Sequence, residues 1–482
     1  MTSTSPPGSL ISRRNALQAA ACGFGWLALA GMQVRSSAVA APGGDGREPG
    51  LPHFPARAKR VIFLFMQGGP SQVDTFDPKP ALDRHDGTRM PFDDPRTVAN
   101  TGKTGTDQRV LRSPWRFTRY GQSGLWVSDL FPHVAGQADR LCVLRSMQTE
   151  GVAHGPATLF LHCGASQVVR PSLGSWLSYG LGSESDNLPA FVTLAPSMGN
   201  GGARNFGNAF LPARHQGLPV GIAGQPAREL TLRNLGDPAR SPEARRRQFG
   251  FLRELQQEQR RRRPGDAGIE AVIQSHELAW RMQSHVPGLL DLSRETPETL
   301  ALYGIGESAT DDYGRQCLMA RRLCEAGVRF VQVTYGDNTA NPRWDQHSDL
   351  PKHAVHARAV DKPVAGLLQD LHRRGLLEDT LVWWGGEFGR TPYAEKDGTG
   401  RDHNPGAFTV WLAGAGVRAG HVHGATDDFG HRAVERPVPM HDLHATLLHL
   451  LGLDHERLVY RYDGRDFRLT DVHGVVVREI LS

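Results

Sequence analysis

Two helix–glycine–strand units follow one another between residues 315 and 384. Residues 315–326 have a helical pattern, Gly327 can adopt the left-handed conformation that ends a helix, and residues 328–335 form an apolar strand. Residues 353–374 then carry apolar side chains along one helical face, Gly375 ends that helix, and 380–384 is the next strand. The repeated unit predicts a parallel sheet whose strands are joined by crossover helices.

Further elements extend this pattern toward both ends of the chain. Four apolar runs predict additional strands: 61–66, 141–144, 190–194 and 407–412. A helix with Pro171 at its opening is predicted to begin within 170–177, and a closing helix spans 442–451. Residues 240–300 are helical and heavily charged, and we interpret them as an insertion that covers the sheet. The predicted fold class is a doubly wound, mainly parallel α/β sheet with helices on both faces and a charged helical insertion.

The first forty residues have the pattern of an export signal. Arg13 and Arg14 form a twin-arginine pair, residues 16–32 are uncharged, and Ala38-Val39-Ala40 is a small-x-small cleavage site. A membrane anchor is the alternative, but an uncharged run of this length is short for spanning a bilayer. We therefore predict a periplasmic or secreted protein without a stable membrane anchor, cleaved near Ala40. Residues 41–57 are predicted to be a linker and 58–482 the folded domain.

The charge of the chain gives no support for nucleic-acid binding. The formal net charge is +5, and removal of residues 1–40 takes away three arginines and no acid, which leaves +2. The one dense basic run, at 260–263, is interpreted as the solvated end of a helix.

Four cysteines remain after the predicted cleavage, too few for a disulfide scaffold in a chain of this length. Cys317 and Cys324 are seven residues apart on one predicted helix, which favours packing roles. For Cys142 and Cys163, both packing and a mutual disulfide remain open.

Acids and histidines follow the predicted strands where those strands end. Glu387 follows the strand 380–384 after two glycines, and Asp402-His403 comes one loop later. Asp345 and His347 follow the strand 328–335, and two residues of separation lets them point the same way in an extended loop. Groups beyond the carboxyl ends of strands line the ligand crevice of an open α/β sheet. Carboxylates and imidazoles together are ligands for a divalent metal ion.

Some of these residues also have an interpretation without a metal. Asp349, a weaker candidate, precedes Leu350-Pro351 and is expected as a helix N-cap. Glu387 is alternatively a buried partner of Arg390, and Asp402 alternatively orients the His403 imidazole.

The loop after the strand 61–66 is predicted to bind an anion. Its sequence contains Gly68, Gly69 and Ser71, whose backbone amides are able to face an anion or a developing oxyanion. Arg390 is predicted to assist in binding the anionic part of a substrate.

Six motifs resemble the bacterial "domain of unknown function 1501" family, which is frequent in planctomycete-type genomes. They are QGGPSQVDTFDPKP (67–80), HGPATLFLHCG (154–164), WDQHSD (344–349), GGEFGRTP (385–392), GRDHNP (400–405) and DLHATLLHLLGLDHERL (442–458). The resemblance covers the whole mature chain. The wider relatives are alkaline-phosphatase-like and sulfatase-like hydrolases, and this implies a doubly wound α/β enzyme with one or two divalent cations at the carboxyl edge of its sheet.

The chain departs from the sulfatase pattern where that pattern supplies the nucleophile. His154 and Gly155-Pro156 stand there, without Cys, Ser or Thr, and the strand 61–66 ends in Gln67, with Asp74 the nearest acid. Three interpretations remain open. His154 acts as nucleophile or general acid/base, a metal-activated water replaces the side-chain nucleophile, or the fold has lost hydrolysis and binds a ligand.

The sequence thus predicts an exported metal-dependent hydrolase of sulfate or phosphate esters, acting through a metal-activated water or His154. The predicted ligands are Asp345, His347, Glu387, Asp402 and His403, the ion being Zn, Mn, Fe, Ca or Mg. The substrate is expected to be a small-molecule or glycan ester. The alternative is a non-catalytic sulfatase-like periplasmic module that keeps the fold, and neighbouring exported cytochrome-like proteins are possible partners in view of the family context.

Overall fold

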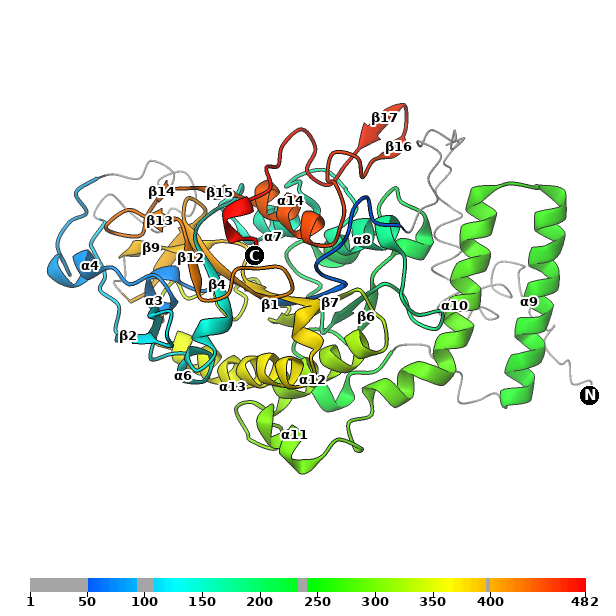
Figure 1. The fold of residues 1–482 in the computed structure, drawn as a ribbon, viewed down its shortest axis with the longest axis horizontal. Helices are drawn as coiled ribbons and strands as arrows, with labels where there is room; N and C mark the ends of the chain where they lie inside the picture. Colours follow the sequence, from blue (N-terminus) through cyan, green and yellow to red (C-terminus); the bar gives the residue numbers. More distant parts are fainter. Residues whose placement is uncertain (1–50, 93–107, 233–240, 396–398) are drawn as a thin grey trace, which may run out of the picture.

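A nine-stranded sheet lies at the centre of the protein, in a computed structural model that describes residues 51–92, 108–232, 241–395 and 399–482 (Figure 1). The order across the sheet is β12 (His421–His423), β4 (Leu141–Gln148), β11 (Phe408–Gly414), β8 (Thr380–Gly385), β1 (Arg60–Met66), β7 (Phe330–Tyr335), β5 (Phe191–Leu194) and β6 (Leu218–Val220), and β15 (Val438–Pro439) also pairs with β4. The predicted export signal, residues 1–40, lies outside the described residues.

The sheet is parallel except at one strand. β11 runs antiparallel to β8 and β4, and every other pairing in this sheet is parallel. The prediction of a mainly parallel sheet is confirmed. The antiparallel strand follows a β-hairpin, β9 (Gly389–Ala394) and β10 (Arg401–Asn404), which turns the chain back toward the sheet. This segment was expected to be a loop.

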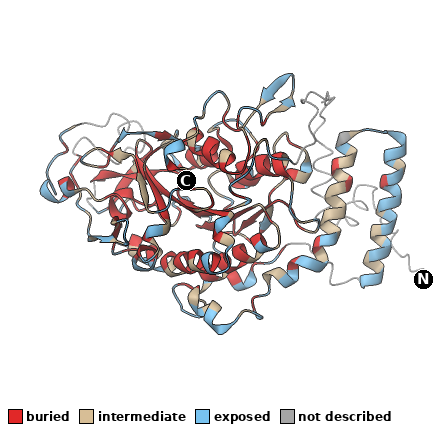
Figure 2. Cartoon of the chain, in the orientation of Figure 1, coloured by how far each residue is buried: buried red, intermediate tan, exposed pale blue. Residues whose placement is uncertain are grey.

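Helices cover both faces of the sheet, as predicted. Side chains of β1 alternate between two apolar clusters, with Ile62 in one and Phe63 in the other. The first cluster is shared with α6 (Pro132–Ala135), α12 (Asp311–Glu325) and α13 (Lys352–Arg373), and the second with α7 (His154–Cys163), α8 (Leu173–Leu181) and α14 (Met440–Leu450). Figure 2 shows the buried residues concentrated between these layers.

The two helix–glycine–strand units have the predicted form. α12 is followed by Gly327 at φ +96° and then β7, and α13 is followed by Gly375 at φ +70° and then β8. A positive φ is readily adopted only by glycine, which explains why both helices end there.

The other predicted elements are present with shifted ends. The runs 61–66, 141–144, 190–194 and 407–412 lie in β1, β4, β5 and β11, and β4 continues to Gln148. α8 begins after Ser172, whose hydroxyl accepts a hydrogen bond from the Ser175 amide. The closing helix is α14.

The charged insertion is helical, but it does not cover the sheet. α9 (Pro242–Arg262) and α10 (Ala267–Leu290) form a hairpin that projects from one end of the molecule, and α11 (Pro297–Leu302) follows (Figure 1). Phe249 stacks on Trp280 between the two helices, with ring centroids 4.6 Å apart. Gln256 is the one residue of α9 that is buried, so this helix has no apolar face for the sheet. Arg261 and Arg262 pair with Glu258 at the exposed helix end.

Short elements complete the described chain. They are α3 (Gln72–Thr75), α4 (Pro80–Arg84), the hairpins β2–β3 (Phe117–Tyr120, Leu125–Ser128), β13–β14 (Ala425–Thr426, Ala433–Glu435) and β16–β17 (Tyr460–Tyr462, Arg465–Phe467), and the 3₁₀ turns η1 (Ala138–Arg140), η2 (Gly202–Phe206), η3 (Ala213–His215), η4 (Ala227–Glu229), η5 (Leu376–Glu378) and η6 (Arg478–Ile480). Residues 51–57, the described part of the predicted linker, lie against the end of α14, where the His53 amide donates to the Gly452 carbonyl.

The cysteines pack as free thiols. Cys142, Cys163, Cys317 and Cys324 are all buried and unpaired, so the open alternative of a Cys142–Cys163 disulfide is excluded. Burial raises the pKa of the Cys142 and Cys163 thiols to about 12, which makes them unreactive at neutral pH. In the part of the chain that the structure describes, no helix has the length and apolarity needed to span a bilayer.

Candidate metal centre

Four loops meet at the carboxyl edge of the sheet. Tyr335 at the end of β7 lies opposite Met66 of β1, and Gly385 at the end of β8 lies opposite Phe65. The loops that follow β1, β7 and β8 therefore leave the sheet side by side, and the loop after β4 joins them. This edge is where open α/β sheets bind ligands.

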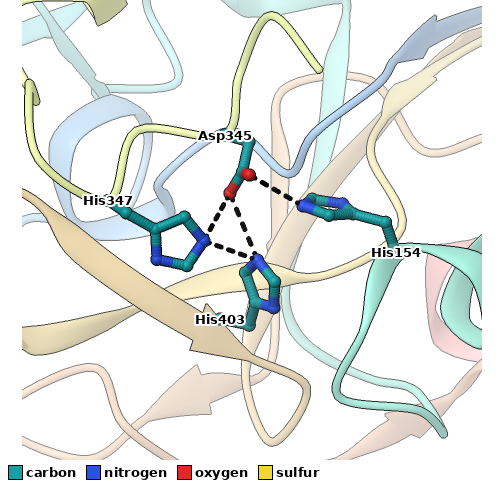
Figure 3. Close-up of side chains that lie close together, drawn as sticks. All are labelled: His154, Asp345, His347 and His403. Carbon is teal, nitrogen blue, oxygen red and sulfur yellow. Dashed lines mark hydrogen bonds and ion pairs between the residues drawn. The ribbon is translucent and has the colours of Figure 1, made fainter. Parts of the chain in front are cut away.

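Three histidines and one aspartate converge at this edge (Figure 3). His154 is the first residue of α7, Asp345 and His347 lie in the loop after β7, and His403 is on β10. One ligand atom from each of the four lies within 4.8 Å of the others. Segments far apart in the sequence thus supply one compact group of nitrogen and oxygen ligands.

The Asp345 carboxylate is surrounded by the Nε2 atoms of the three imidazoles. Its Oδ1 lies 2.8 Å from Nε2 of His347 and 3.2 Å from Nε2 of His403. Its Oδ2 lies 3.2 Å from Nε2 of His154. The Nε2 atoms of His347 and His403 are 3.0 Å apart.

The opposite nitrogen of each ring is held by a separate acceptor. Nδ1 of His154 lies 2.6 Å from Oε1 of Glu387, and Nδ1 of His403 lies 2.7 Å from the Val152 carbonyl. Nδ1 of His347 contacts Glu395. An acceptor at Nδ1 places the proton of a neutral imidazole there and leaves Nε2 with a free lone pair. Metal-binding histidines are oriented in this way by carboxylates and backbone carbonyls.

These residues fit a cation. Nε2 of His154 is buried and makes no hydrogen bond, so a lone pair points into the group without a donor. With a proton on each Nδ1, His347 and His403 direct two lone pairs at each other, which requires a proton or a cation between them. The two Nε2 atoms, 3.0 Å apart, would together be able to hold such a cation.

Arg390 keeps Asp345 ionised. Its Nη2 lies 2.7 Å from Oδ1 of Asp345, and both side chains are buried. Burial acts to raise the pKa of Asp345, but Arg390 and the three histidines outweigh burial and hold that pKa far below its usual range.

The three imidazoles have different proton affinities. Burial lowers the pKa of His403 to about 3, so this ring is neutral. For His347 burial is outweighed by the hydrogen bonds to Asp345 and Glu395, which raise the pKa to about 9. The pKa of His154 is also raised, because burial, which lowers it, is outweighed by the contacts with Asp345 and Glu387. Without a cation, the position between the rings is therefore taken by a proton on His347.

Two predicted ligands, Glu387 and Asp402, are not members of this group of four but contact its histidines from outside. Glu387 accepts the Gly68 amide with both carboxylate oxygens, at 3.0 and 3.1 Å, and orients His154. It is not the partner of Arg390, because that guanidinium pairs with Asp345. Asp402 accepts the amide of His403 at 2.7 Å, and its Oδ1 lies 3.8 Å from Nδ1 of His347.

Asp349 has neither of the roles considered for it. Its carboxylate is about half exposed and pairs with Lys352 at 3.2 Å. Pro351 occupies the N-cap position of α13, without a side-chain cap.

Three of the four predicted anion-binding residues, Gly68, Ser71 and Arg390, have other partners. The Gly68 amide donates to Glu387 and the Ser71 amide donates to Nε2 of His353 at 3.2 Å, while the Ser71 hydroxyl donates to Asp74. The buried Arg390 guanidinium donates to Asp345 and to the carbonyls of Gly68, Gly69, Trp344 and Arg401. None of these donors is left for an anion, and Gly69 is enclosed by the Phe388 ring, 2.7 Å from where a Cβ would stand.

Sequence reasoning missed Glu395. This residue directly follows β9, and the β9–β10 pairing, with Ala394 opposite Arg401, brings it close to the predicted pair Asp402-His403. Recognition of 389–404 as a hairpin would have been the signal, because an acid at the end of β9 then faces the start of β10.

Comparison with known proteins gives the family of the chain. A family profile described as "Protein of unknown function (DUF1501)" matches residues 58–481. The chain belongs to this family. No curated protein sequence matches this DUF1501 chain.

Solved structures similar to the DUF1501 chain include a synthase, a sulfatase and a phosphatase. The lipoteichoic acid synthase LtaP from Listeria monocytogenes aligns at 9% identity over 86% of this chain and 76% of its own, with a TM-score of 0.33. PsFucS1 sulfatase from Pseudoalteromonas sp. aligns at 12% identity over 90% and 72%, also at 0.33. Alkaline phosphatase from the Antarctic bacterium TAB5 aligns at 9% identity over 78% and 96%, at 0.30.

Proposed function

We propose that this protein is an exported, metal-dependent hydrolase of sulfate or phosphate esters that uses a metal-activated water. In this proposal His154, Asp345, His347 and His403 bind the catalytic ion. Glu387, Glu395 and the Val152 carbonyl orient the three imidazoles. The substrate is a small-molecule or glycan ester.

One observation supports the metal most strongly: three Nε2 atoms meet at one carboxylate while each Nδ1 has its own acceptor. Nitrogen-rich sites of this kind suit Zn, Fe or Mn, whereas Ca and Mg prefer shells made of oxygen. We therefore assign the site to a transition metal or zinc.

The surroundings of His154 favour a ligand role over a nucleophilic one. Its Nδ1 is committed to Glu387 and its Nε2 points at Asp345, so neither nitrogen is directed at a separate substrate position. A bound divalent ion would polarise an ester oxygen and lower the pKa of a bound water toward neutrality. Arg390 contributes by keeping Asp345 ionised, and Glu387 by fixing the ring of His154.

A second candidate function follows from the absence of a side-chain nucleophile. His154 stands where sulfatases present Cys or Ser, which agrees with a non-catalytic sulfatase-like module that binds a glycan or exported cytochrome-like proteins. This alternative keeps the fold and the cation but requires no turnover.

Metal analysis of natively exported protein tests the proposal. We expect Zn, Fe or Mn in stoichiometric amount, and loss of the metal in His403→Ala. His285→Ala, an exposed histidine on α10, serves as the matched control and should keep the metal. Metal-free native protein would overturn the proposed site. Sequencing of the mature N-terminus in the same preparation tests export and cleavage near Ala40.

A substrate screen separates the two candidate functions. Aryl sulfates and aryl phosphates are offered with Zn²⁺, Mn²⁺, Fe²⁺, Ca²⁺ or Mg²⁺ added singly. Turnover that disappears in His154→Ala and persists in His285→Ala supports the hydrolase. A metal-loaded protein that turns over none of these esters supports the binding module.

A further inference from the structure

An open hollow of about 270 Å³ lies between the end of α7 and the start of α14. It is lined by the loop 164–170 after α7, by His441 in the first turn of α14, and by Asp471 and His473 after β17. Glu150, from the loop before α7, also lines it. The volume is close to the lower end of the range for small-molecule sites, about 300–1,000 Å³. The hollow is therefore large enough for one ring-shaped unit of a ligand.

His441 offers this hollow an acceptor without a partner. The residue is only 7% exposed, and its Nε2 donates to the Gly164 carbonyl at 3.0 Å. Burial lowers the pKa of His441, so the ring is neutral and carries its proton on Nε2. No residue that the structure describes hydrogen-bonds to its Nδ1. The exposed His473 ring stacks on His441, with centroids 5.1 Å apart. A ligand hydroxyl that donates to Nδ1 would complete this site.

Charged groups in and beside the hollow balance one another. Nη2 of Arg170 lies 3.4 Å from Oδ2 of Asp471, and Nη2 of Arg465 lies 2.6 Å from Oδ1 of the same carboxylate. With Glu150, two arginines stand against two carboxylates, which gives no net charge to select an ion. Donors and acceptors side by side suit hydroxyl groups, because each hydroxyl both donates and accepts.

Aromatic rings continue from the hollow along the β16–β17 hairpin. The Arg170 guanidinium lies over the Phe467 ring, 4.7 Å from its centroid, so this ring begins where the hollow ends. Phe467 lies 4.8 Å from Phe210, and Phe210 stacks on Tyr462 with centroids 5.0 Å apart. The three rings are partly exposed, and the hairpin projects beyond α14 (Figure 1). Such rings can pack against the apolar face of a sugar ring while their edges remain in water.

The hollow lies at the same edge of the sheet as the candidate metal centre. α14 begins directly after β15, which pairs with the carboxyl end of β4. The loop between β4 and α7 carries both Glu150 and Val152, whose carbonyl holds Nδ1 of His403. α7 has ten residues, so its ends, His154 in the metal centre and Gly164 in the hollow, are about 15 Å apart. A ligand that reaches from one to the other is longer than a single sugar ring.

We propose that the hollow and the three rings Phe210, Tyr462 and Phe467 bind a sugar chain, and that the ester substrate is an oligosaccharide whose remote units lie there. Sugar binding is independent of turnover, whereas the statement that this sugar carries the ester rests on the proposed function. Hydroxyls of one unit exchange hydrogen bonds with His441 and the Arg170–Asp471 pair, and neighbouring units stack on the rings.

Titration calorimetry with neutral tetrasaccharides of glucose, galactose, mannose and xylose tests the sugar site. We expect at least one of them to bind the full-length wild type in the millimolar range or tighter. His473→Ala and Tyr462→Ala should each bind it about tenfold more weakly. His285→Ala and Phe251→Ala remove an exposed imidazole and an exposed ring from the α9–α10 hairpin and are the matched controls. Binding by none of the four sugars overturns the proposal, as does binding that His473→Ala and Tyr462→Ala leave unchanged.

His403→Ala separates this proposal from the proposed function. This variant should lose the metal but bind the same tetrasaccharide as tightly as the wild type does. Sugar binding by a wild type that holds no metal and turns over no ester would remove the hydrolase and leave the sugar site.

The substrate part is tested with monosulfated forms of the bound tetrasaccharide. Their KM should rise about tenfold in Tyr462→Ala with kcat retained, because the ring contributes binding far from the reacting group. An unchanged KM would show that the substrate does not reach the hairpin.

Discussion

Asp74 and Asp345 are both buried aspartates paired with a buried arginine, yet their surroundings give them different roles. Asp74 lies on α3 after β1, and Arg401 of β10 contacts it at 2.7 and 3.2 Å. Asp345 lies after β7, and Arg390 of β9 contacts it at 2.7 Å. The same hairpin thus supplies one arginine to each aspartate.

The two aspartates differ in the other side chains that contact each carboxylate. The remaining contact of Asp74 is the Ser71 hydroxyl, so its partners are a guanidinium, which is always protonated, and one hydroxyl that donates its proton to the carboxylate. The remaining contacts of Asp345 are three imidazole nitrogens, which exchange a proton for a metal ion. A buried aspartate–arginine pair is therefore structural in one place and part of a candidate metal centre a short distance away.

Asp74→Asn should give the largest loss of stability. The substitution leaves the Arg401 charge buried without a carboxylate, and breaking a buried ion pair in this way costs about 3–5 kcal/mol. Denaturant unfolding of the metal-free protein measures the change in the free energy of unfolding, and the metal content of folded protein should stay at the wild-type level. A loss below about 1 kcal/mol would show that the pair does not hold α3 and β10 together.

Asp345→Asn should reduce cation affinity strongly and stability less than Asp74→Asn does. Removal of a direct ligand should lower cation affinity by more than the roughly 10–100-fold expected for a supporting residue. Stability of the metal-free protein should fall by less than in Asp74→Asn, because one of four neighbouring carboxylates is removed and Arg390 keeps four carbonyl acceptors. Metal titration and unfolding of the two variants side by side check this. Equal metal affinity in both would contradict the comparison.

Glu387→Gln sharpens the distinction between ligand and support. Gln keeps an oxygen for Nδ1 of His154 but loses the charge, so cation affinity should fall about 10–100-fold while the fold is retained. Competition with a chelator of known affinity measures the shift, and Asp349→Asn should show none. A complete loss of binding would instead make Glu387 a direct ligand.

His353 contacts the loop that carries Ser71 and Asp74, and it should make the stability of the protein depend on pH. Its Nε2 accepts the Ser71 amide at 3.2 Å, and burial lowers its pKa to about 3 from an ordinary value of 6.5. The folded protein therefore holds His353 neutral, and the unfolded chain binds the extra proton. This contribution to stability is complete above about pH 6.5 and is lost as the pH falls toward 3.

Of the four substitutions, His353→Gln should have the smallest effect. It should weaken the dependence of the free energy of unfolding on pH. Between pH 6 and 4 the free energy of unfolding should fall less steeply than in the wild type, by up to about 1.4 kcal/mol per pH unit. Unfolding curves collected at several pH values give the slope, and an unchanged slope would mean that His353 is protonated in the folded state.

Much of the fold was predictable because its signals are local. The glycines that end α12 and α13, the continuous apolar run of β1 and the charged composition of α9 each depend on a few neighbouring residues. The antiparallel direction of β11 and the projecting position of the α9–α10 hairpin were not predictable in this way. Both depend on which surfaces meet after the chain has folded.

For the candidate site, the sequence by itself determined the residue types and the edge of the sheet to which they belong. Asp345, His347 and His403 were selected as ligands from acids and histidines that follow strands, and His154 from its place in the family motif. Only the tertiary structure decided that Glu387 and Asp402 contact histidines of the group without belonging to it. It also decided that Glu395 contacts His347 and that Arg390 pairs with Asp345. The reason is physical: the function of a carboxylate depends on the donors and charges within a few ångströms, and here distant loops supply those neighbours.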